Sequence, residues 1–355
     1  LKESGAAAFV VRAILRRFHR RKVPLFVLLA LLLLVPGGLT GAGSVTVLIM
    51  GGMAATILGT MDIPGPKVAA IIFVIAGLSA AAPPVNLWAM LTAAGVNMPY
   101  VGFFLPLLVP CVVLALLTIF ILGAGAKPVD LAKAMAELPV APAGMSWLRV
   151  AVPFLVFFLL VAAGRVFPFD VPVLGLPLMF AAAAAAALAL SPVRLDVWRI
   201  SRDTVHQLLP LVGTLTCAGI LVQIMALTGV RGLIAITTVT LPVTVVFLTL
   251  FLTLPVSEAV LMWGAAPVLG VPLVLLFNTI GLDPVIALAG MSVIWPLGDA
   301  IPPTAIIGRL TTSTVGMKEP YGKFLRACLV PAALIAVIGT LMVVFSKKLA
   351  FLQVF

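Results

Sequence analysis

The sequence predicts an all-α polytopic membrane protein that contains two structural repeats, with broken helices and re-entrant hairpins. Three observations lead to this prediction. Hydrophobic residues make up 63% of the 355 residues, and the mean hydropathy is +1.30. Charged residues make up only 9%, whereas a soluble domain carries roughly 25% and uses them to cover its surface. Two motifs also occur twice, in the same order. Soluble enzymes, nucleic-acid-binding domains and disordered chains are therefore excluded.

Long uncharged stretches place the membrane segments along the chain. A helix needs about 20 apolar residues to cross a bilayer, so we expect about 9–11 membrane segments, some of them incomplete crossings. They are expected near residues 24–40, 43–61, 66–95, 99–124, 148–167, 171–191, 207–228, 232–254, 256–280, 283–313 and 321–346. Residues 192–206 mix charged and apolar side chains, which predicts an amphipathic surface helix that leads into the next span.

The distribution of charge divides the chain into five parts. Residues 1–23 form a basic leader, whose cations are typical of a cytoplasmic flank and also suit an anionic membrane surface. We interpret this charge as a topology signal and expect the lipid bilayer, and no nucleic acid, as its partner. A first repeat is expected over 24–124, connecting helices and polar loops over 125–206, a second repeat over 207–346, and a tail over 347–355.

The most informative feature of the sequence is an internal repeat. Residues 77–84 read GLSAAAPP and residues 296–303 read PLGDAIPP, while residues 99–110 read PYVGFFLPLLVP and residues 320–331 read PYGKFLRACLVP. The only two tyrosines of the chain, Tyr100 and Tyr321, occupy equivalent positions in the second pair. Matched motifs in the same order at nearly the same spacing predict a duplication rather than chance similarity between apolar segments.

Each Pro-Pro pair, Pro83–Pro84 and Pro302–Pro303, lies inside an apolar stretch. A proline lacks the N–H group and strains the preceding turn, so two in succession are expected to interrupt a helix. Free backbone groups are tolerated at membrane depth only where protein or a watery cavity satisfies them. Two interrupted helices at matching places in two repeats are typical of the central site of a secondary transporter. A simple kink is the alternative interpretation.

Polar side chains gather near both breaks. Ser79 and Asn86 lie near the first, and Asp299 and Thr304 near the second. Oxygen is the ligand that hard cations prefer, so these residues are candidates for binding Na⁺, the only metal ion we expect. Asp299 is the strongest candidate for an ion ligand, because an ionised carboxylate inside a membrane is costly and usually functional.

The same regions offer candidates for binding a substrate. These are Asn86, Thr92, Arg309 and Thr311. The guanidinium of Arg309 suits a two-pronged hydrogen bond to a carboxylate. The alternatives for Arg309 are an ion pair with Asp299 or a position at the membrane interface.

A second glycine-rich or proline-interrupted stretch precedes each break, over residues 41–61 and 255–276. We expect these stretches to form re-entrant hairpins, with tips at Gly51 and Gly52 in the first and at Gly264 and Ala265 in the second. Glu258, near the start of the second stretch, is the other costly charge. It is interpreted as an ion ligand, as a partner of Arg231, or as an interfacial residue at a helix end.

Motifs of the common enzyme classes are absent from the sequence. It holds no H-E-x-x-H, no G-x-S-x-G and no phosphate-binding loop, and its three cysteines are far apart. We therefore expect no catalytic residue, no cofactor and no transition metal. Without a nucleotide site, uphill transport would draw on an ion gradient or on a partner subunit.

At the repeats the sequence resembles the large membrane subunit of TRAP (tripartite ATP-independent periplasmic) transporters, within the ion-transporter superfamily. The resemblance rests on AAPPVNLWAMLTAAGVNMPYVGFFLPLLVP, on GDAIPPTAIIGRLTTSTVGMKEPYGKFLRACLVP and on the stretch TLPVSEAVLMWGAAPVLGVPLVLLFNTIGLDPVIALAGM. It covers roughly residues 40–346, weakly in the middle. Carried over by motif, it implies ion-binding regions at Ser79–Asn86 and Gly298–Thr304, and a second hairpin tip from Ser257 to Ala266. Gly298 and Ser257 thereby join the candidate ion ligands.

The resemblance also implies a function. It is that of a sodium-coupled importer of small organic anions, typically carboxylates, with the two repeats moving as an elevator-like transport domain. A small four-helix membrane subunit and a periplasmic substrate-binding protein would complete the system in the bacterial inner membrane. Three alternatives remain: a self-sufficient transporter of the same superfamily driven by Na⁺ or H⁺, a membrane-embedded enzyme, and a structural subunit. The relative orientation of the two repeats also stays open. If every expected segment from 99 to 280 crosses the membrane fully, the two broken helices run in opposite directions and the repeats are inverted. If 256–280 alone is a re-entrant hairpin, the broken helices run in the same direction.

Overall fold

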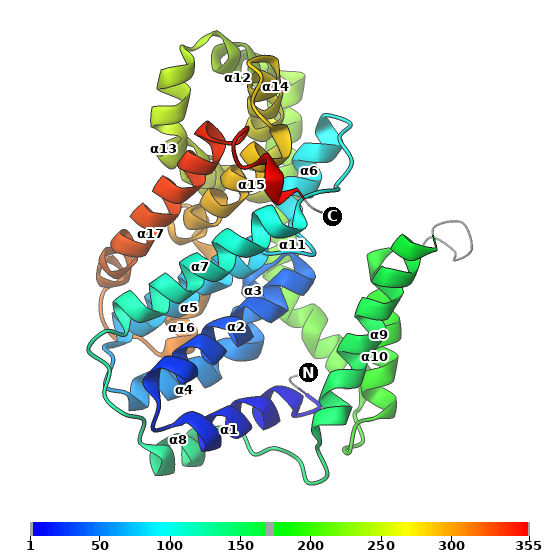
Figure 1. Cartoon of the computed structure of the whole chain (residues 1–355), viewed down its shortest axis with the longest axis vertical. Helices are drawn as coiled ribbons and strands as arrows, with labels where there is room; N and C mark the ends of the chain where they lie inside the picture. The colour runs from blue at the N-terminus through cyan, green and yellow to red at the C-terminus, as the bar shows by residue number, and fades with distance from the viewer. Residues whose placement is uncertain (1–2, 168–173, 354–355) are drawn as a thin grey trace. The chain divides into compact units, whose positions relative to one another are not determined.

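The computed structural model describes residues 3–167 and 174–353, and all the regular elements in these residues are helical (Figure 1). The chain divides into two compact units. The first combines Leu1–His19 with Leu131–Leu208, and the second combines Arg20–Asp130 with Leu209–Phe355. The second unit holds both Pro-Pro pairs, so it carries the candidate site.

The first unit is built from a basic helix and a helical pair. Its elements are α1 (Ala6–Phe18), α8 (Leu131–Glu137), α9 (Trp147–Val166), α10 (Leu176–Ala189) and the start of α11 (Val197–Leu227). The guanidinium of Arg12 in α1 donates to the carbonyl oxygens of Met135 at 3.1 Å and Leu138 at 3.0 Å. The last carbonyls of a helix have no partner within it. Arg12 therefore fastens α1 to the end of α8.

The second unit contains two series of elements. The first series comprises α2 (Lys22–Thr40), α3 (Gly43–Thr46), η1 (Val47–Gly51), α4 (Gly52–Thr60), α5 (Gly65–Ala81), α6 (Leu87–Gly95) and α7 (Phe104–Leu122). The second comprises α12 (Val230–Thr240), α13 (Val243–Leu261), η2 (Met262–Gly264), η3 (Ala266–Gly270), α14 (Val271–Thr279), α15 (Pro284–Ile294), η4 (Trp295–Ala300), α16 (Ile306–Val315), α17 (Tyr321–Val344) and η5 (Ala350–Leu352). Elements η1 and η3 are π-helical; η2, η4 and η5 are 3₁₀ helices.

The lengths of the apolar helices make this a multi-pass membrane protein. In the described residues, six helical segments are long and apolar enough to cross a bilayer. A seventh arises if the end of α11 and α12, bent by 76°, count as one span. Helices such as α5, with 17 residues, are shorter than a full crossing. Complete crossings are therefore fewer than the apolar stretches.

Element boundaries in the two series recur at a constant spacing of 219 residues. The starts of η1, α4, α5 and α6, at residues 47, 52, 65 and 87, correspond to those of η3, α14, α15 and α16, at 266, 271, 284 and 306. Left-handed backbone recurs at the same spacing, at Asp62 and Gly281 and at Asn97 and Gly316. Two segments of different sequence thus share one sequence of helices, π-segments and turns.

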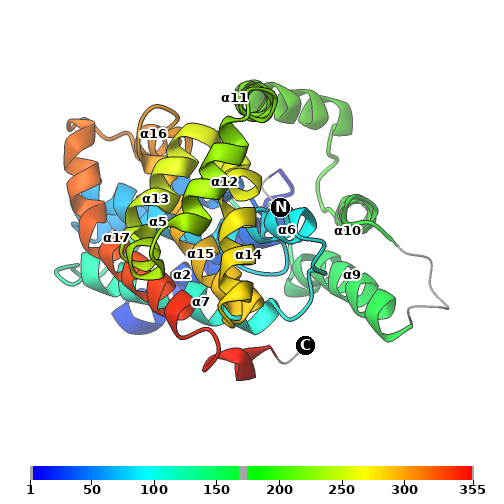
Figure 2. The ribbon, with the colours of Figure 1, turned by 90° about the horizontal axis from the view of Figure 1, so that it is seen from above.

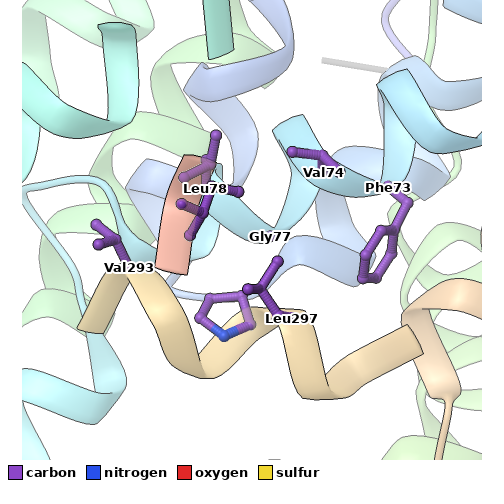
Figure 3. A pocket seen from close by; sticks show the side chains of 8 residues that line it. Phe73, Val74, Gly77, Leu78, Val293 and Leu297 are labelled. Carbon is purple, nitrogen blue, oxygen red and sulfur yellow. The ribbon is translucent and has the colours of Figure 1, made fainter. Parts of the chain in front are cut away.

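The two series interlock. Helix α6 packs against η3, and α16 packs against η1, so the helix that follows each Pro-Pro pair contacts the other series. Figure 3 shows the crossing of α5 with α15 and η4, where Val74, Gly77 and Leu78 meet Val293 and Leu297. A Cβ on Gly77 would lie 3.0 Å from the Cβ of Pro296, so glycine permits this close crossing. In Figure 1, α7 descends from right to left while α17 rises from left to right, so the two run in opposite directions.

The prediction of a hairpin tip at Gly51 and Gly52 is wrong. Both residues have helical dihedral angles, and the change of direction falls earlier, at Gly41, where φ is +71°. A Cβ on Gly51 would lie 3.2 Å from Val47 Cγ1 of the same segment and in ordinary contact with Thr314 of α16, at 3.4 Å, and no atom lies within 4 Å of a Cβ on Gly52. The two glycines therefore continue the helical segment, and neither a turn nor a close helix crossing requires them.

The second hairpin also begins elsewhere than expected. Pro255 and Ser257 lie inside α13, and the expected span over 232–254 is divided at Leu241–Pro242. The backbone leaves the helical region at Met262, where φ is +52°, two residues before Gly264. Ala265 is helical, with φ −59° and ψ −36°. A proline at position 255 is tolerated within a helix because neighbouring groups in a membrane protein satisfy the freed carbonyl.

Candidate functional site

The first helix break lies between α5 and α6, and Asn86 spans it. Its side-chain amide donates to the carbonyl oxygen of Ala81, the last residue of α5, at 2.8 Å. Its side-chain oxygen accepts the N–H of Ala89 in the first turn of α6 at 2.9 Å. Both peptide bonds between paired prolines in the chain are cis. Asn86 is fully buried, so this one side chain satisfies groups at two helix ends that water does not reach.

Ser79, one turn before this break, belongs to a chain of hydrogen bonds. The N–H of Gly37 donates to Thr46 Oγ1 at 2.9 Å, Thr46 Oγ1 lies 2.8 Å from Ser79 Oγ, and Ser79 Oγ donates to the Ala76 carbonyl at 2.6 Å. A Cβ at Gly37 would overlap Ser79, so only glycine fits at this position. The hydroxyl groups therefore join α2, α3 and α5.

The second break, between η4 and α16, is built from different residues. The Tyr321 hydroxyl donates to the carbonyl of Ala300 at 2.8 Å, which takes the place of the Asn86 amide. Thr304 Oγ1 donates to the carbonyl of Ala259 in α13 at 2.9 Å. The residue equivalent to Asn86 is Ala305, which has φ +42° and offers no side-chain cap. Gly298 stands where the first series has Ser79, and α13 packs directly against it.

Two buried carboxylates lie beside the second break. Glu258 in α13 is 1% exposed and Asp299 in η4 is 4% exposed. Glu258 Oε2 accepts the indole N–H of Trp88 in α6 at 2.7 Å, a bond that joins the two series. In the parts of the chain that the structure describes, no hydrogen bond or ion pair reaches the Asp299 carboxylate, and the ion pair between Lys127 and Asp62 lies at the exposed surface. No cation among the described residues is therefore paired with these carboxylates.

Both expected arginine partners lie elsewhere. Arg231 donates to the carbonyl of Pro267 at 3.0 Å and makes no ion pair with Glu258. Arg309 is exposed on α16 and makes no ion pair with Asp299. The hydroxyl of Ser257 donates to the Leu254 carbonyl of its own helix at 2.7 Å. The structure therefore gathers Gly298, Asp299 and Thr304 against α13, and leaves Arg309 at the surface.

Several buried polar atoms of α15, η4 and α16 have no partner in the described structure. They are Ser292 Oγ, Trp295 Nε1 and Thr311 Oγ1. Thr92, the equivalent of Thr311, donates weakly to the Ala266 carbonyl at 3.3 Å. A buried polar group without a partner costs about 1–3 kcal/mol, and such groups are commonly met by water or a ligand. Trp88 and Trp295 are not among the candidate ion- or substrate-binding residues predicted from the sequence, although a buried indole N–H, which needs an acceptor, is a signal for such a role.

Comparison of the sequence with protein-family models and with curated proteins finds no match. The resemblance to TRAP transporters therefore rests on the three quoted sequence stretches alone.

The hydrogen bonds of Asn86 lead to a first prediction. Asn86→Ala removes an N-cap and leaves the Ala81 carbonyl unpaired, so the free energy of unfolding should fall by about 2–4 kcal/mol. Asn86→Ser retains a capping oxygen and should lose less. Thermal unfolding of the purified proteins measures both. A fully stable Asn86→Ala protein would show that Asn86 does not hold the break together.

Proposed function

We propose that this chain is the membrane subunit of a sodium-coupled secondary transporter that imports small organic anions, and that the coupling ion binds at the second helix break. The observation that carries the proposal is the buried Asp299 carboxylate beside an interrupted helix, with no cation of the described residues paired to it. An uncompensated charge in a membrane interior is costly, so a bound cation is its natural counter-charge. Carboxylate, hydroxyl and carbonyl oxygens of Asp299, Thr304 and the adjacent backbone are suitable ligands for Na⁺.

The architecture supports transport by two inverted repeats. Equivalent elements recur, both series contain an interrupted helix, and α7 and α17 run in opposite directions. Inverted repeats with discontinuous helices place substrate and ion sites where the repeats meet, and rocking of one part against another gives alternating access. We propose an elevator-type movement of this kind.

The two breaks have different tasks in this proposal. At the first break, Ser79 and Asn86 already use their polar atoms in hydrogen bonds that hold helices together. At the second, the equivalent positions are Gly298 and Ala305, and a carboxylate appears at Asp299 where the first series has Ala80. We therefore assign Ser79 and Asn86 to support of the fold, and the ion to the second break.

Arg309 is the residue we propose for the anionic substrate. It is exposed on α16, the helix that follows the second break, and makes no ion pair with any acidic residue that the structure describes. Its planar guanidinium suits a carboxylate. A periplasmic binding protein that delivers the substrate, a small membrane subunit and a location in the bacterial inner membrane belong to the proposal through the resemblance of the repeats.

Uptake into proteoliposomes tests the proposal. The protein, reconstituted with the products of neighbouring genes where these encode a small membrane subunit and a binding protein, should accumulate an organic anion when Na⁺ is high outside. Dissipating the gradient with a sodium ionophore should stop accumulation. Accumulation that ignores Na⁺ would contradict sodium coupling.

A proton-driven transporter is the second candidate, and Glu258 together with Asp299 favours it. Buried carboxylates without a cation also bind protons, because neutralisation removes the cost of burying charge. A pH gradient in sodium-free buffer distinguishes the two candidates. Accumulation under that condition would assign proton coupling.

A further inference from the structure

A groove lies between α12 and the η3–α14 segment, away from the helix breaks. Figure 2 shows α12 beside α14, and α12 packs against both η3 and α14. The groove encloses about 260 Å³. One wall carries Ala235, Ile236 and Val239 of α12, and the other includes Val271 and Leu275 of α14. These side chains are spaced for one face of each helix, so two aliphatic faces oppose each other across a space that protein does not fill.

Arg231 is the one charged residue that lines this groove. It is also the only charged residue between Asp203 and Glu258 in the sequence. Its guanidinium donates one hydrogen bond, to the Pro267 carbonyl at 3.0 Å, and makes no ion pair with any residue that the structure describes. A guanidinium has five N–H donors, so most of its capacity is uncommitted. A lone arginine in an apolar surface is costly unless an anion accompanies it.

The shape and chemistry of the groove select one kind of occupant. A small polar anion would meet a single charge and otherwise aliphatic walls. An anionic phospholipid has both an acyl chain for the walls and a phosphate for the guanidinium. Arg231 and Val239 lie eight residues apart on α12, so the groove is about 12 Å long at 1.5 Å per residue. That length is comparable with the roughly 15 Å of hydrocarbon in one leaflet of a bilayer.

We propose that this groove binds an anionic phospholipid, with the phosphate on Arg231 and an acyl chain between α12 and α14. Apolar contact alone gives little selectivity, because lipid tails are as apolar as the groove. Selectivity comes from the charge-assisted, two-pronged contact of guanidinium and phosphate. The bound lipid links α12 to η3 at the residue next to Ala266. The carbonyl oxygen of Ala266 accepts a hydrogen bond from the Thr92 hydroxyl of α6. The site is independent of ion coupling and holds whichever ion drives transport.

Lipid-dependent stability of the purified full chain tests the proposal. In detergent micelles, the melting temperature is measured against increasing phosphatidylglycerol or phosphatidylcholine, and retained lipid is counted by native mass spectrometry. Phosphatidylglycerol should stabilise the protein at a concentration at least tenfold lower than phosphatidylcholine. Soluble glycerol 3-phosphate, which offers the phosphate without the chain, should not stabilise it.

Three variants locate the effect. Arg231→Gln should abolish the preference for phosphatidylglycerol, whereas Arg326→Gln, at an exposed arginine of α17, should retain it. Ala235→Trp keeps the charge but fills the groove, so it should also weaken phosphatidylglycerol binding at least tenfold, which guards against a folding defect of Arg231→Gln. Equal effects of the two lipids, or an unchanged preference in both Arg231→Gln and Ala235→Trp, would overturn the proposal.

Discussion

Asp299→Asn should abolish sodium-driven uptake while the protein remains folded. Asparagine has nearly the same volume as aspartate and keeps one carbonyl oxygen, so packing around η4 is preserved. The substitution removes the negative charge that balances the ion. Leaving one member of a buried charge pair alone costs about 3–5 kcal/mol, and a loss of about 3 kcal/mol weakens sodium binding roughly 100-fold. Because Asp299 is 4% exposed, water cannot replace the missing charge.

Uptake is measured in proteoliposomes as a function of external Na⁺, beside thermal unfolding of the same preparation. Asp283→Asn is the matched control. Asp283 caps α15 by accepting the N–H of Ile286 at 3.0 Å, and asparagine caps a helix as well as aspartate does. The control should retain both uptake and stability. If Asp299→Asn kept the sodium dependence of the unchanged protein, the ion would have to bind elsewhere.

The positions of the two breaks follow from local sequence, because consecutive prolines disrupt helix geometry in any surroundings. The N-cap role of Asn86 can also be predicted from local sequence, beside the ion-binding role, because an asparagine that follows a Pro-Pro pair and precedes an apolar helical stretch has the signature of an N-cap. Its second bond, to the Ala81 carbonyl, depends on how the chain folds across the break.

Other features depend on tertiary packing and cannot be predicted from the local sequence. Trp88 and Glu258 are 170 residues apart, and their hydrogen bond forms because α6 of one series packs into the other series. The glycines at 51 and 52 are compatible with either a turn or a continuous helical segment. Their helical dihedral angles decide between these conformations, and the fold of the whole segment sets those angles. That Arg231 and Arg309 make no ion pair with any described residue likewise follows from where their helices lie.

Gly298 allows η4 to pack closely against α13, beside Asp299. We expect Gly298→Ala to lower the free energy of unfolding more than the other substitutions. A Cβ at this position would overlap the carbonyl oxygen of Pro255 and lie 2.6 Å from the Cβ of Glu258. Backbone atoms of α13 cannot rotate away, so α13 and η4 would have to separate. Overpacking costs about 1–3 kcal/mol where side chains can adjust, and more where a backbone must move. We therefore expect a loss of about 3 kcal/mol or more.

Gly59→Ala is the matched control for this prediction. Gly59 lies within α4, and no atom comes within 4 Å of a Cβ built there. Replacing a glycine inside a helix by alanine stabilises by up to about 1 kcal/mol, so this variant should melt at the same temperature or higher. The comparison isolates the contact with α13 from helix propensity. A Gly298→Ala protein that melts like the unchanged protein would mean that α13 does not pack closely on η4, and Asp299 would then lie in a more open environment than its burial indicates.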